Sequence, residues 1–221
     1  IGKGLFLKAE KTLVIGDLHL GYEEMLINKG VLVPKAQLKE TLQDLEELVK
    51  KTKPLQIVIN GDLKHEFGRV LGQEWKDTLA LVDWIKKQGI KLIVIKGTHD
   101  PILKPILNKR SLETIDSLQL GKIFIFHGDK ETKIPSVVEV VIIGHEHPAI
   151  TLREGRKTEK FCAAQARPTG RGGLHIALCR GRGASDGQAP TRGRGRPRVR
   201  VCTRCKPGCA AHRDCYRDFH R

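Results

Sequence analysis

The sequence predicts an α/β fold in which helices alternate with the strands of a largely parallel sheet. Five short aliphatic runs bounded by glycine have the length and β-branched content of strands that are buried on both faces. Amphipathic segments lie between the first three runs, and a helix between two strands gives the right-handed crossover that joins parallel neighbours. The runs are LVIGDLH (Leu13 to His19), IVINGD (Ile57 to Asp62), LIVIKGTHD (Leu92 to Asp100), IFIFHGD (Ile123 to Asp129) and VVIIGHEH (Val140 to His147).

The amphipathic segments predict three helices. A short helix is expected over Tyr22 to Asn28. A longer one starts near Pro34, which suits a first turn, and its core-facing side chains recur at helical spacing. These side chains are Leu38, Leu42, Leu45, Leu48 and Val49.

The third helix is predicted from about Gln73 to Lys87, where Gly89 ends it. An apolar stripe along this segment predicts that one face packs on the core. We interpret Trp75 and Trp84 as core residues rather than as a base-stacking surface. The stripe consists of Trp75, Leu79, Val82 and Ile85.

Each of the five predicted strands ends in Asp and His residues. Ligands in open α/β sheets collect where the strands end, so these side chains are expected to meet. They offer more oxygen and imidazole donors than one ion takes from protein, which predicts two ions that share a carboxylate. The donors are Asp17, His19, Asp62, His99, His127, His145 and His147.

The alternative for each motif alone is a structural or solvated loop. A single D-x-H or G-D pair occurs in many chains without a ligand role, whereas five such endings in series favour a metal site. Glycines precede Asp17, Asp62, Thr98 and His145. We expect them to let the backbone turn sharply and to give a phosphate close access.

The ordered motifs GDLH, GD, G-x-HD, HG and GHEH resemble those of the calcineurin-like metallophosphoesterase superfamily. The runs GDLHLGYEE and GDLKHEFG resemble its archaeal SbcD-related branch, and the resemblance covers about residues 4 to 160. It implies a two-sheet α/β/β/α sandwich with a binuclear metal site that hydrolyses phosphate esters.

The resemblance also implies a ligand set. Asp17, His19 and His147 are expected to hold the first metal, and His127 and His145 the second. Asp62 is expected to bridge the two.

The resemblance places His99 beside the substrate, with Asp100 orienting its imidazole. One position departs from the family pattern, which is G-N-H-D with an Asn amide oxygen on the second metal. This chain has Thr98 there, and its hydroxyl is shorter and a poorer donor. We therefore expect a second metal site that is weaker but still works, and the alternative is a loss of activity.

Charge suggests the mechanism. Two cations ~3.5–4 Å apart neutralise a phosphate ester and lower the pKa of a bridging water, whose hydroxide attacks phosphorus in line. His99 is the motif imidazole without a metal assignment, so it is the candidate general acid. The donor set favours Mn²⁺ or Fe²⁺, and Zn²⁺, Co²⁺ and Ni²⁺ also fit.

Two further residues directly follow Asp62. Lys64 and His65 are placed to touch the phosphate oxygens of a substrate, and the alternative is a solvated loop.

The composition changes near residue 160. Residues 161–221 contain 14 Lys and Arg against 3 Asp, a net charge of +11, so residues 1–160 carry only +4 of the total of +15. All 6 Cys also lie beyond residue 160. We therefore predict a metallophosphoesterase domain over residues 1–160 and an Arg/Gly/Cys-rich tail over residues 161–221, with a composition typical of disorder.

Three interpretations of this tail are open. Its run RGRGRPRVR (Arg192 to Arg200) is typical of a nucleic-acid-binding extension. A zinc site is the second interpretation. An abrupt switch from Lys-rich to Arg-rich sequence is also what a shifted reading frame produces, and we favour this third interpretation. The zinc candidates are Cys202, Cys205, Cys209, His212 and Cys215.

A foreign tail would leave the second sheet incomplete. The segment TLREGRKTEKF (Thr151 to Phe161) is then the start of a strand without partners, and such an edge favours aggregation or dimerisation. No apolar run approaches 20 residues and no signal peptide is visible, so we expect a cytoplasmic chain that does not span a membrane.

Two functions follow. The first is hydrolysis of phosphate esters by a two-metal site, with DNA or RNA diesters or nucleotides as substrates. The alternative is a non-catalytic nucleic-acid-binding protein that uses the Arg/Gly-rich tail.

Overall fold

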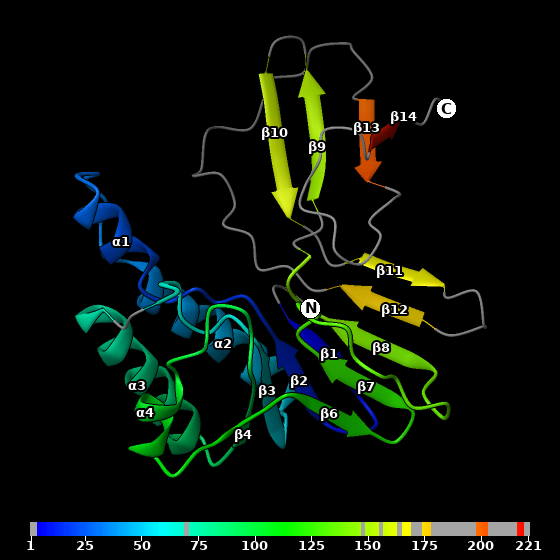
Figure 1. Ribbon diagram of the computed structural model, residues 1–221, viewed down its shortest axis with the longest axis horizontal. Helices are drawn as coiled ribbons and strands as arrows, with labels where there is room; N and C mark the ends of the chain where they lie inside the picture. The colour runs from blue at the N-terminus through cyan, green and yellow to red at the C-terminus, as the bar shows by residue number, and fades with distance from the viewer. Residues whose placement is uncertain are drawn as a thin grey trace.

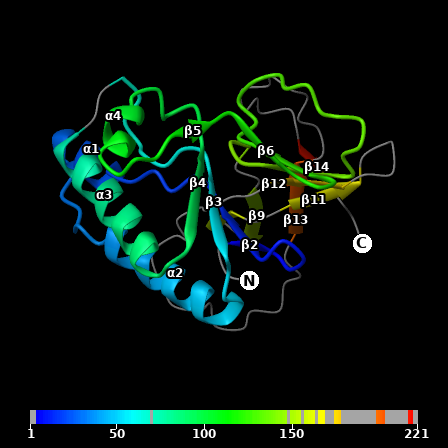
Figure 2. The ribbon, with the colours of Figure 1, turned by 90° about the horizontal axis from the view of Figure 1, so that it is seen from below.

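Two mixed β-sheets lie face to face in the computed structural model, and the helices cover the outer face of the first sheet (Figures 1 and 2). The structure describes residues 4–68 and 71–146, together with the strand backbones 149–154, 157–162, 165–168, 174–177, 198–202 and 216–218. Among these residues, no helix is both long and apolar enough to cross a membrane.

The first sheet confirms the predicted parallel arrangement. Its strand order is β1-β2-β3-β4-β5, and every neighbouring pair from β2 to β5 is parallel, while β1 is antiparallel to β2. The strands are β1 (Leu5–Leu7), β2 (Thr12–Ile15), β3 (Gln56–Asn60), β4 (Lys91–Ile95) and β5 (Thr114–Ile115).

The helices are α1 (Tyr22–Asn28), α2 (Gln37–Thr52), α3 (Gly72–Lys87) and α4 (Lys104–Asn108). α1 has the predicted bounds, and α3 begins one residue earlier than predicted. Pro34 does not lie in the first turn of α2, which begins three residues later. The cause is a cap from another helix, because the Glu23 carboxylate of α1 accepts the backbone N–H groups of Ala36 and Gln37 at 2.9 and 2.8 Å.

The strands are buried on both faces because two cores flank the first sheet. In β2, Leu13 and Ile15 face the helices, while Val14 faces the second sheet. The second core joins the two sheets through Val14, Val58, Ile95, Ile125 and Ile142. The core role predicted for both tryptophans is confirmed, since Trp75 and Trp84 pack against the helix-facing core.

The second sheet contains the other two predicted motif strands, β7 (Ile123–Phe126) and β8 (Val140–Ile143), which are parallel. Its order is β11-β12-β8-β7-β6, with β6 at Ser117–Leu120, β11 at Gln165–Pro168 and β12 at Leu174–Ala177. The last two strands come from beyond residue 160, so this sheet extends further than the sequence predicted. The predicted α/β fold with two sheets is confirmed, and within the described ranges the helices lie on the side of the first sheet (Figure 2).

The segment predicted as a partnerless strand forms a hairpin-like pair instead. β9 (Ala149–Glu154) and β10 (Lys157–Cys162) are antiparallel, and β9 also pairs with β13 (Arg198–Cys202). β14 (Tyr216–Asp218) completes a separate four-stranded sheet. The side chains of the arginine run and of the zinc candidates lie outside the described residues, as does His147.

Candidate metal centre

The loops that follow the strands bring most of the predicted donors together. Asp17 and His19 follow β2, Asp62 follows β3, His127 follows β7 and His145 follows β8. Their ligand atoms form two groups, and within each group all the atoms lie within 4.8 Å of one another. One group is Asp17, His19 and Asp62, and the other is Asp62, His127 and His145. A third group consists of His19, His65 and His99.

Asp62 belongs to both carboxylate-containing groups. Its Oδ2 lies 3.8 Å from Nε2 of His19, and its Oδ1 lies 3.3 Å from Nε2 of His127. Oδ1 also accepts the backbone N–H of His99 at 2.9 Å. The carboxylate therefore stands between a histidine from the β2 loop and a histidine from the second sheet.

A backbone carbonyl fixes the ring of His127. Nδ1 donates to the carbonyl of Asn60 at 3.0 Å, because a carbonyl can only accept, and this leaves Nε2 on the side of Asp62. The role of Asn60 was not predicted, since a carbonyl group is the same in every residue and has no sequence signal.

The donors sit on strained backbone. Asp17, His19, Asp62 and His145 have φ values of 53°, 46°, 49° and 58°. Residues other than glycine rarely adopt this left-handed region, and when they do they cluster at functional sites.

The glycines before these residues have a packing role that was not predicted. Of Gly16, Gly61, Gly97 and Gly144, only Gly61 has a positive φ, at 78°. A Cβ on Gly61 would lie 2.1 Å from Nδ1 of His127, and one on Gly97 would lie 2.3 Å from the backbone N of Asp62. Gly61 and Gly97 let the loops pack against one another, and the residue after the glycine has a left-handed φ at Asp17, Asp62 and His145.

Hydrogen bonds tie the loops together. The backbone N–H groups of Asp17 and His19 donate to the carbonyls of Gly61 and Asp62 at 3.1 and 2.8 Å. The Gln37 amide at the start of α2 donates to the carbonyls of Leu18 and His19 at 3.0 and 2.8 Å. Helix α2 therefore helps to hold His19 in place.

The buried charges of the centre fit a divalent cation. Asp17 is only 2% exposed, and its Oδ2 has no hydrogen-bond partner among the described residues. Burial raises the pKa of Asp17 to about 7. A buried carboxylate oxygen without a partner is costly, and a metal ion would satisfy it. Carboxylate and imidazole donors suit Mn²⁺, Fe²⁺ and Zn²⁺.

Asp62 and His127 support each other electrostatically. Burial alone disfavours the charged form of both groups, but His127 and its hydrogen bond hold the pKa of Asp62 below its usual range. Burial would lower the pKa of His127, yet the hydrogen bond and charge of Asp62 raise it to about 9. The proton on the His127 imidazole thus supplies the positive charge next to Asp62 that a bound cation would otherwise supply.

His99 is oriented by a partner other than the predicted one. Its Nδ1 donates to the carbonyl of His65 at 2.5 Å. The Asp100 carboxylate, expected to orient this ring, instead accepts the backbone N–H groups of Gly97 and Leu63 at 3.0 and 3.1 Å. Asp100 is 1% exposed, and it joins the β3 loop to the β4 loop.

Lys64 differs from both interpretations made from the sequence. It has no exposed surface, and its ammonium donates to the carbonyl of Glu66. It therefore lies neither in a solvated loop nor against the space open to a substrate. Burial lowers the pKa of Lys64. His65 is half-buried, and its ring stacks on that of His99 with centroids 5.6 Å apart.

Thr98 lies beside the second donor group. Its Oγ1 is 3.3 Å from Nδ1 of His145, whose ring is 5.2 Å from that of His127. The hydroxyl is thus close to the side chains expected to hold the second metal.

Glu74 was not predicted, although it shapes the same region. This buried residue lies in the first turn of α3, and its Oε1 accepts the backbone N–H groups of His65 and Glu66 at 3.0 and 2.5 Å. Its Oε2 accepts the N–H of Leu71 at 2.9 Å. A Glu in the first turn of an amphipathic helix is ordinarily a surface residue, so the sequence contains no signal for this role.

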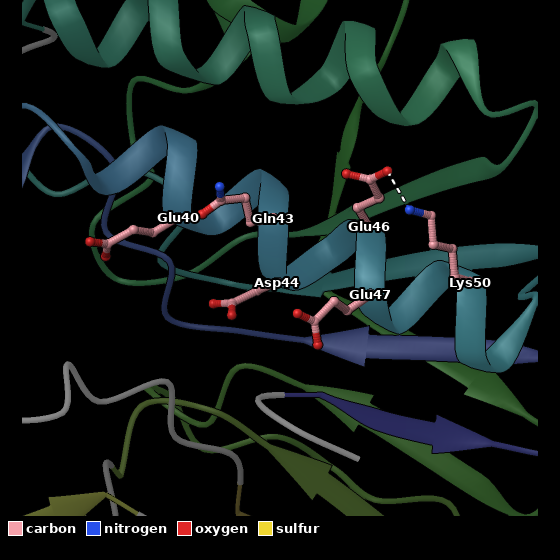
Figure 3. Close-up of a pocket in the computed structure, with 6 residues that line it drawn as sticks. All are labelled: Glu40, Gln43, Asp44, Glu46, Glu47 and Lys50. Carbon is pink, nitrogen blue, oxygen red and sulfur yellow. Dashed lines mark ion pairs between the residues drawn. The ribbon is translucent and has the colours of Figure 1, made fainter.

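A hollow on the surface of α2 shares no residue with the metal centre. Figure 3 shows its side chains, and Lys50 pairs with Glu46 at 2.7 Å. The lining residues are Glu40, Gln43, Asp44, Glu46, Glu47 and Lys50. They form the charged outer face of an amphipathic helix.

Known proteins resemble this chain in family and in fold. Residues 10–151 match the family described as calcineurin-like phosphoesterase. The fold is similar to the crystal structure of the nuclease MPE of Pseudomonas putida, with a TM-score of 0.54, 19% identity, and coverage of 90% of this chain and 88% of that one. The Escherichia coli phosphoesterase YfcE gives a TM-score of 0.42 at 19% identity, with coverage of 86% and 87%. No curated protein matches in sequence.

The packing at Gly61 generates a prediction. Gly61→Ala should displace the His127 ring and weaken metal binding, because its Cβ has no room. Gly30→Ala is the matched control, since Gly30 has a similar φ of 82° but no atom within 4 Å of an added Cβ. Both variants should lose about 1 kcal/mol of unfolding free energy from backbone strain. Only Gly61→Ala should also lose metal affinity, measured by calorimetric titration with Mn²⁺. Equal affinities in the two variants would contradict the packing role.

Proposed function

The chain belongs to the calcineurin-like phosphoesterase family and is a hydrolase of phosphate esters, and we propose that its substrates are phosphodiesters of nucleic acids or nucleotides. The observation that supports a two-metal reaction is the position of Asp62 in two donor groups. The diester class rests on the motifs GDLHLGYEE and GDLKHEFG, which resemble the SbcD-related branch.

We assign the donors to two ions. Asp17 and His19 would hold the first, together with His147, which lies outside the described residues. His127, His145 and Thr98 would hold the second, and Asp62 would contact both. Two divalent cations, with Mn²⁺ the preferred ion, would supply charge neutralisation of the ester and a lowered pKa of water.

His99 is proposed as the general acid. The carbonyl of His65 accepts the proton on Nδ1, so Nε2 is the ring atom that would carry the transferred proton. That proton goes to the leaving oxygen as its bond to phosphorus breaks. Glu74 positions this acid indirectly, because it holds the backbone of His65 whose carbonyl binds the ring.

The first test concerns metal. Asp62→Asn should abolish release of p-nitrophenol from bis-p-nitrophenyl phosphate in Mn²⁺, since one charge of the shared carboxylate is lost. Asn tolerates the left-handed φ of 49° at this position, so the fold should survive. Circular dichroism would check the fold, and elemental analysis would count the ions. Full activity in the variant, or a single ion in the parent at saturating Mn²⁺, would contradict the two-metal assignment.

The second test concerns proton transfer. His99→Ala should keep the metal stoichiometry but slow hydrolysis of diesters with poor leaving groups by about 10²–10⁴. Diesters with good leaving groups need less help from an acid, so they should slow less. The measurement is kcat across a series of aryl and alkyl leaving groups. A variant that loses one ion instead would identify His99 as a ligand, in line with its closeness to His19 and His65.

The third test concerns residue 98. Thr98→Asn should lower the Mn²⁺ concentration at half-maximal rate, because an amide oxygen reaches further and donates better than the hydroxyl beside His145. Affinity of the first site should change little, since Asp17 and His19 belong to another loop. Rate against Mn²⁺ concentration would be compared with the parent. An unchanged profile would show that residue 98 is not a ligand.

A further inference from the structure

Phe67 is an exposed aromatic side chain beside His99, the proposed general acid. It is 51% exposed, and it comes directly after Glu66. Its ring contacts that of His99 with centroids 5.3 Å apart and planes at 76°. This is the edge-to-face geometry that aromatic pairs prefer. One part of the ring is therefore fixed against His99, and the rest remains available to another molecule.

Phe67 is the exposed end of a row of rings. Tyr22 at the start of α1 contacts His65 at 4.7 Å, and His65 stacks on His99 at 5.6 Å with planes at 22°. The backbone just before Phe67 is held in place, because the Glu74 carboxylate accepts the N–H groups of His65 and Glu66. The row thus rests on a helix and a buried carboxylate rather than on a free loop.

The proposed role of His99 places Phe67 on one side of the substrate. A general acid must come within about 2.6–3.2 Å of the oxygen that it protonates. Whatever group is attached to that leaving oxygen then lies next to the His99 ring. Of the rings beside His99, Phe67 is the exposed one, whereas those of His19 and His65 are partly buried, so Phe67 is the ring best placed to contact the leaving group.

We infer that Phe67 stacks on the nucleobase of the leaving nucleoside, which makes phosphodiesters with an unpaired leaving nucleoside the substrate class. This inference rests on the proposed function. A phenyl ring has no hydrogen-bonding group, so it should accept any of the four bases through their flat faces. A base inside a duplex has both faces covered by its neighbours, so the contact requires an unpaired base. In the reaction, water oxygen bonds to phosphorus, the bond from phosphorus to the nucleoside oxygen breaks, and His99 protonates that oxygen.

Three small diesters test this contact. The first is thymidylyl-thymidine, and the other two replace one or the other nucleoside by a tetrahydrofuran residue that lacks a base. The nucleoside that keeps the phosphate after hydrolysis identifies the leaving oxygen, so the leaving side is known from the products. The variants are Phe67→Ala and Phe67→Trp. Leu55→Ala is the matched control, because Leu55 is an exposed apolar residue, 67% accessible, that precedes β3 at its opposite end.

The expected result is a base effect confined to the leaving side. In the parent, removal of the leaving-side base should lower kcat/KM roughly 5- to 150-fold, the range that one base–aromatic stack supports. Removal of the other base should matter far less. We call the kcat/KM for thymidylyl-thymidine divided by that for the diester without a leaving-side base the leaving-side ratio. Phe67→Ala should bring this ratio close to one, whereas Phe67→Trp should keep the parent's ratio. Leu55→Ala should also match the parent.

Several results would overturn the inference. A leaving-side ratio that survives in Phe67→Ala, equal rates on all three diesters in the parent, or a dependence on the retained base would each show that Phe67 does not stack on the leaving nucleoside. Hydrolysis of bis-p-nitrophenyl phosphate without any hydrolysis of the dinucleotides would also exclude it, while leaving phosphoesterase activity intact. A parent that hydrolyses neither kind of diester in Mn²⁺ would instead overturn the proposed function.

Discussion

The centre depends on one turn, Asn60–Asp62, against which the other loops close. The carbonyl of Asn60 fixes the His127 ring, the carbonyl of Gly61 accepts the N–H of Asp17, and Asp62 accepts backbone N–H groups from both the β2 and β4 loops. Because Gly61 has no side chain, the second sheet can bring His127 within reach of the first. The packing that forms the core between the sheets therefore also sets the distances between the donors. Sheets that moved apart would also separate the donors.

The main strands were predictable because a short run of consecutive apolar residues indicates a strand that is buried on both faces. Strands with apolar residues on both faces need a core on each side, and β2, β3 and β4 have both. The start of α2 was not predictable from Pro34, because its cap comes from Glu23 in another helix. The strand pairing beyond residue 160 was also missed. β12 pairs with β8, which lies more than thirty residues earlier in the chain, and the short apolar run LHIAL (Leu174 to Leu178) is its one local sign in the sequence.

The donor types were predictable, whereas their partners were not. Asp and His after strand ends indicate a metal centre because their chemistry is in the side chain itself. The predicted partner of His99 was wrong, since the ring binds the carbonyl of His65 and Asp100 binds backbone N–H groups. Lys64 looked like a phosphate ligand from its place after Asp62, but it is buried. Burial and contacts with backbone carbonyls depend on how the loops pack against one another. The type of a single residue does not reveal that packing.

The left-handed backbone at Asp17 and His145 has a consequence for how the chain can vary. Each position must satisfy two separate requirements, one for the donor atom and one for the backbone shape. Asp, Asn and His meet the second requirement more readily than β-branched residues do. Random replacement at these positions will therefore damage shape and chemistry together, and sequence libraries built there will be enriched in misfolded members. Asn in place of Asp17 keeps the shape while removing the charge, so it separates the two requirements that other substitutions confuse.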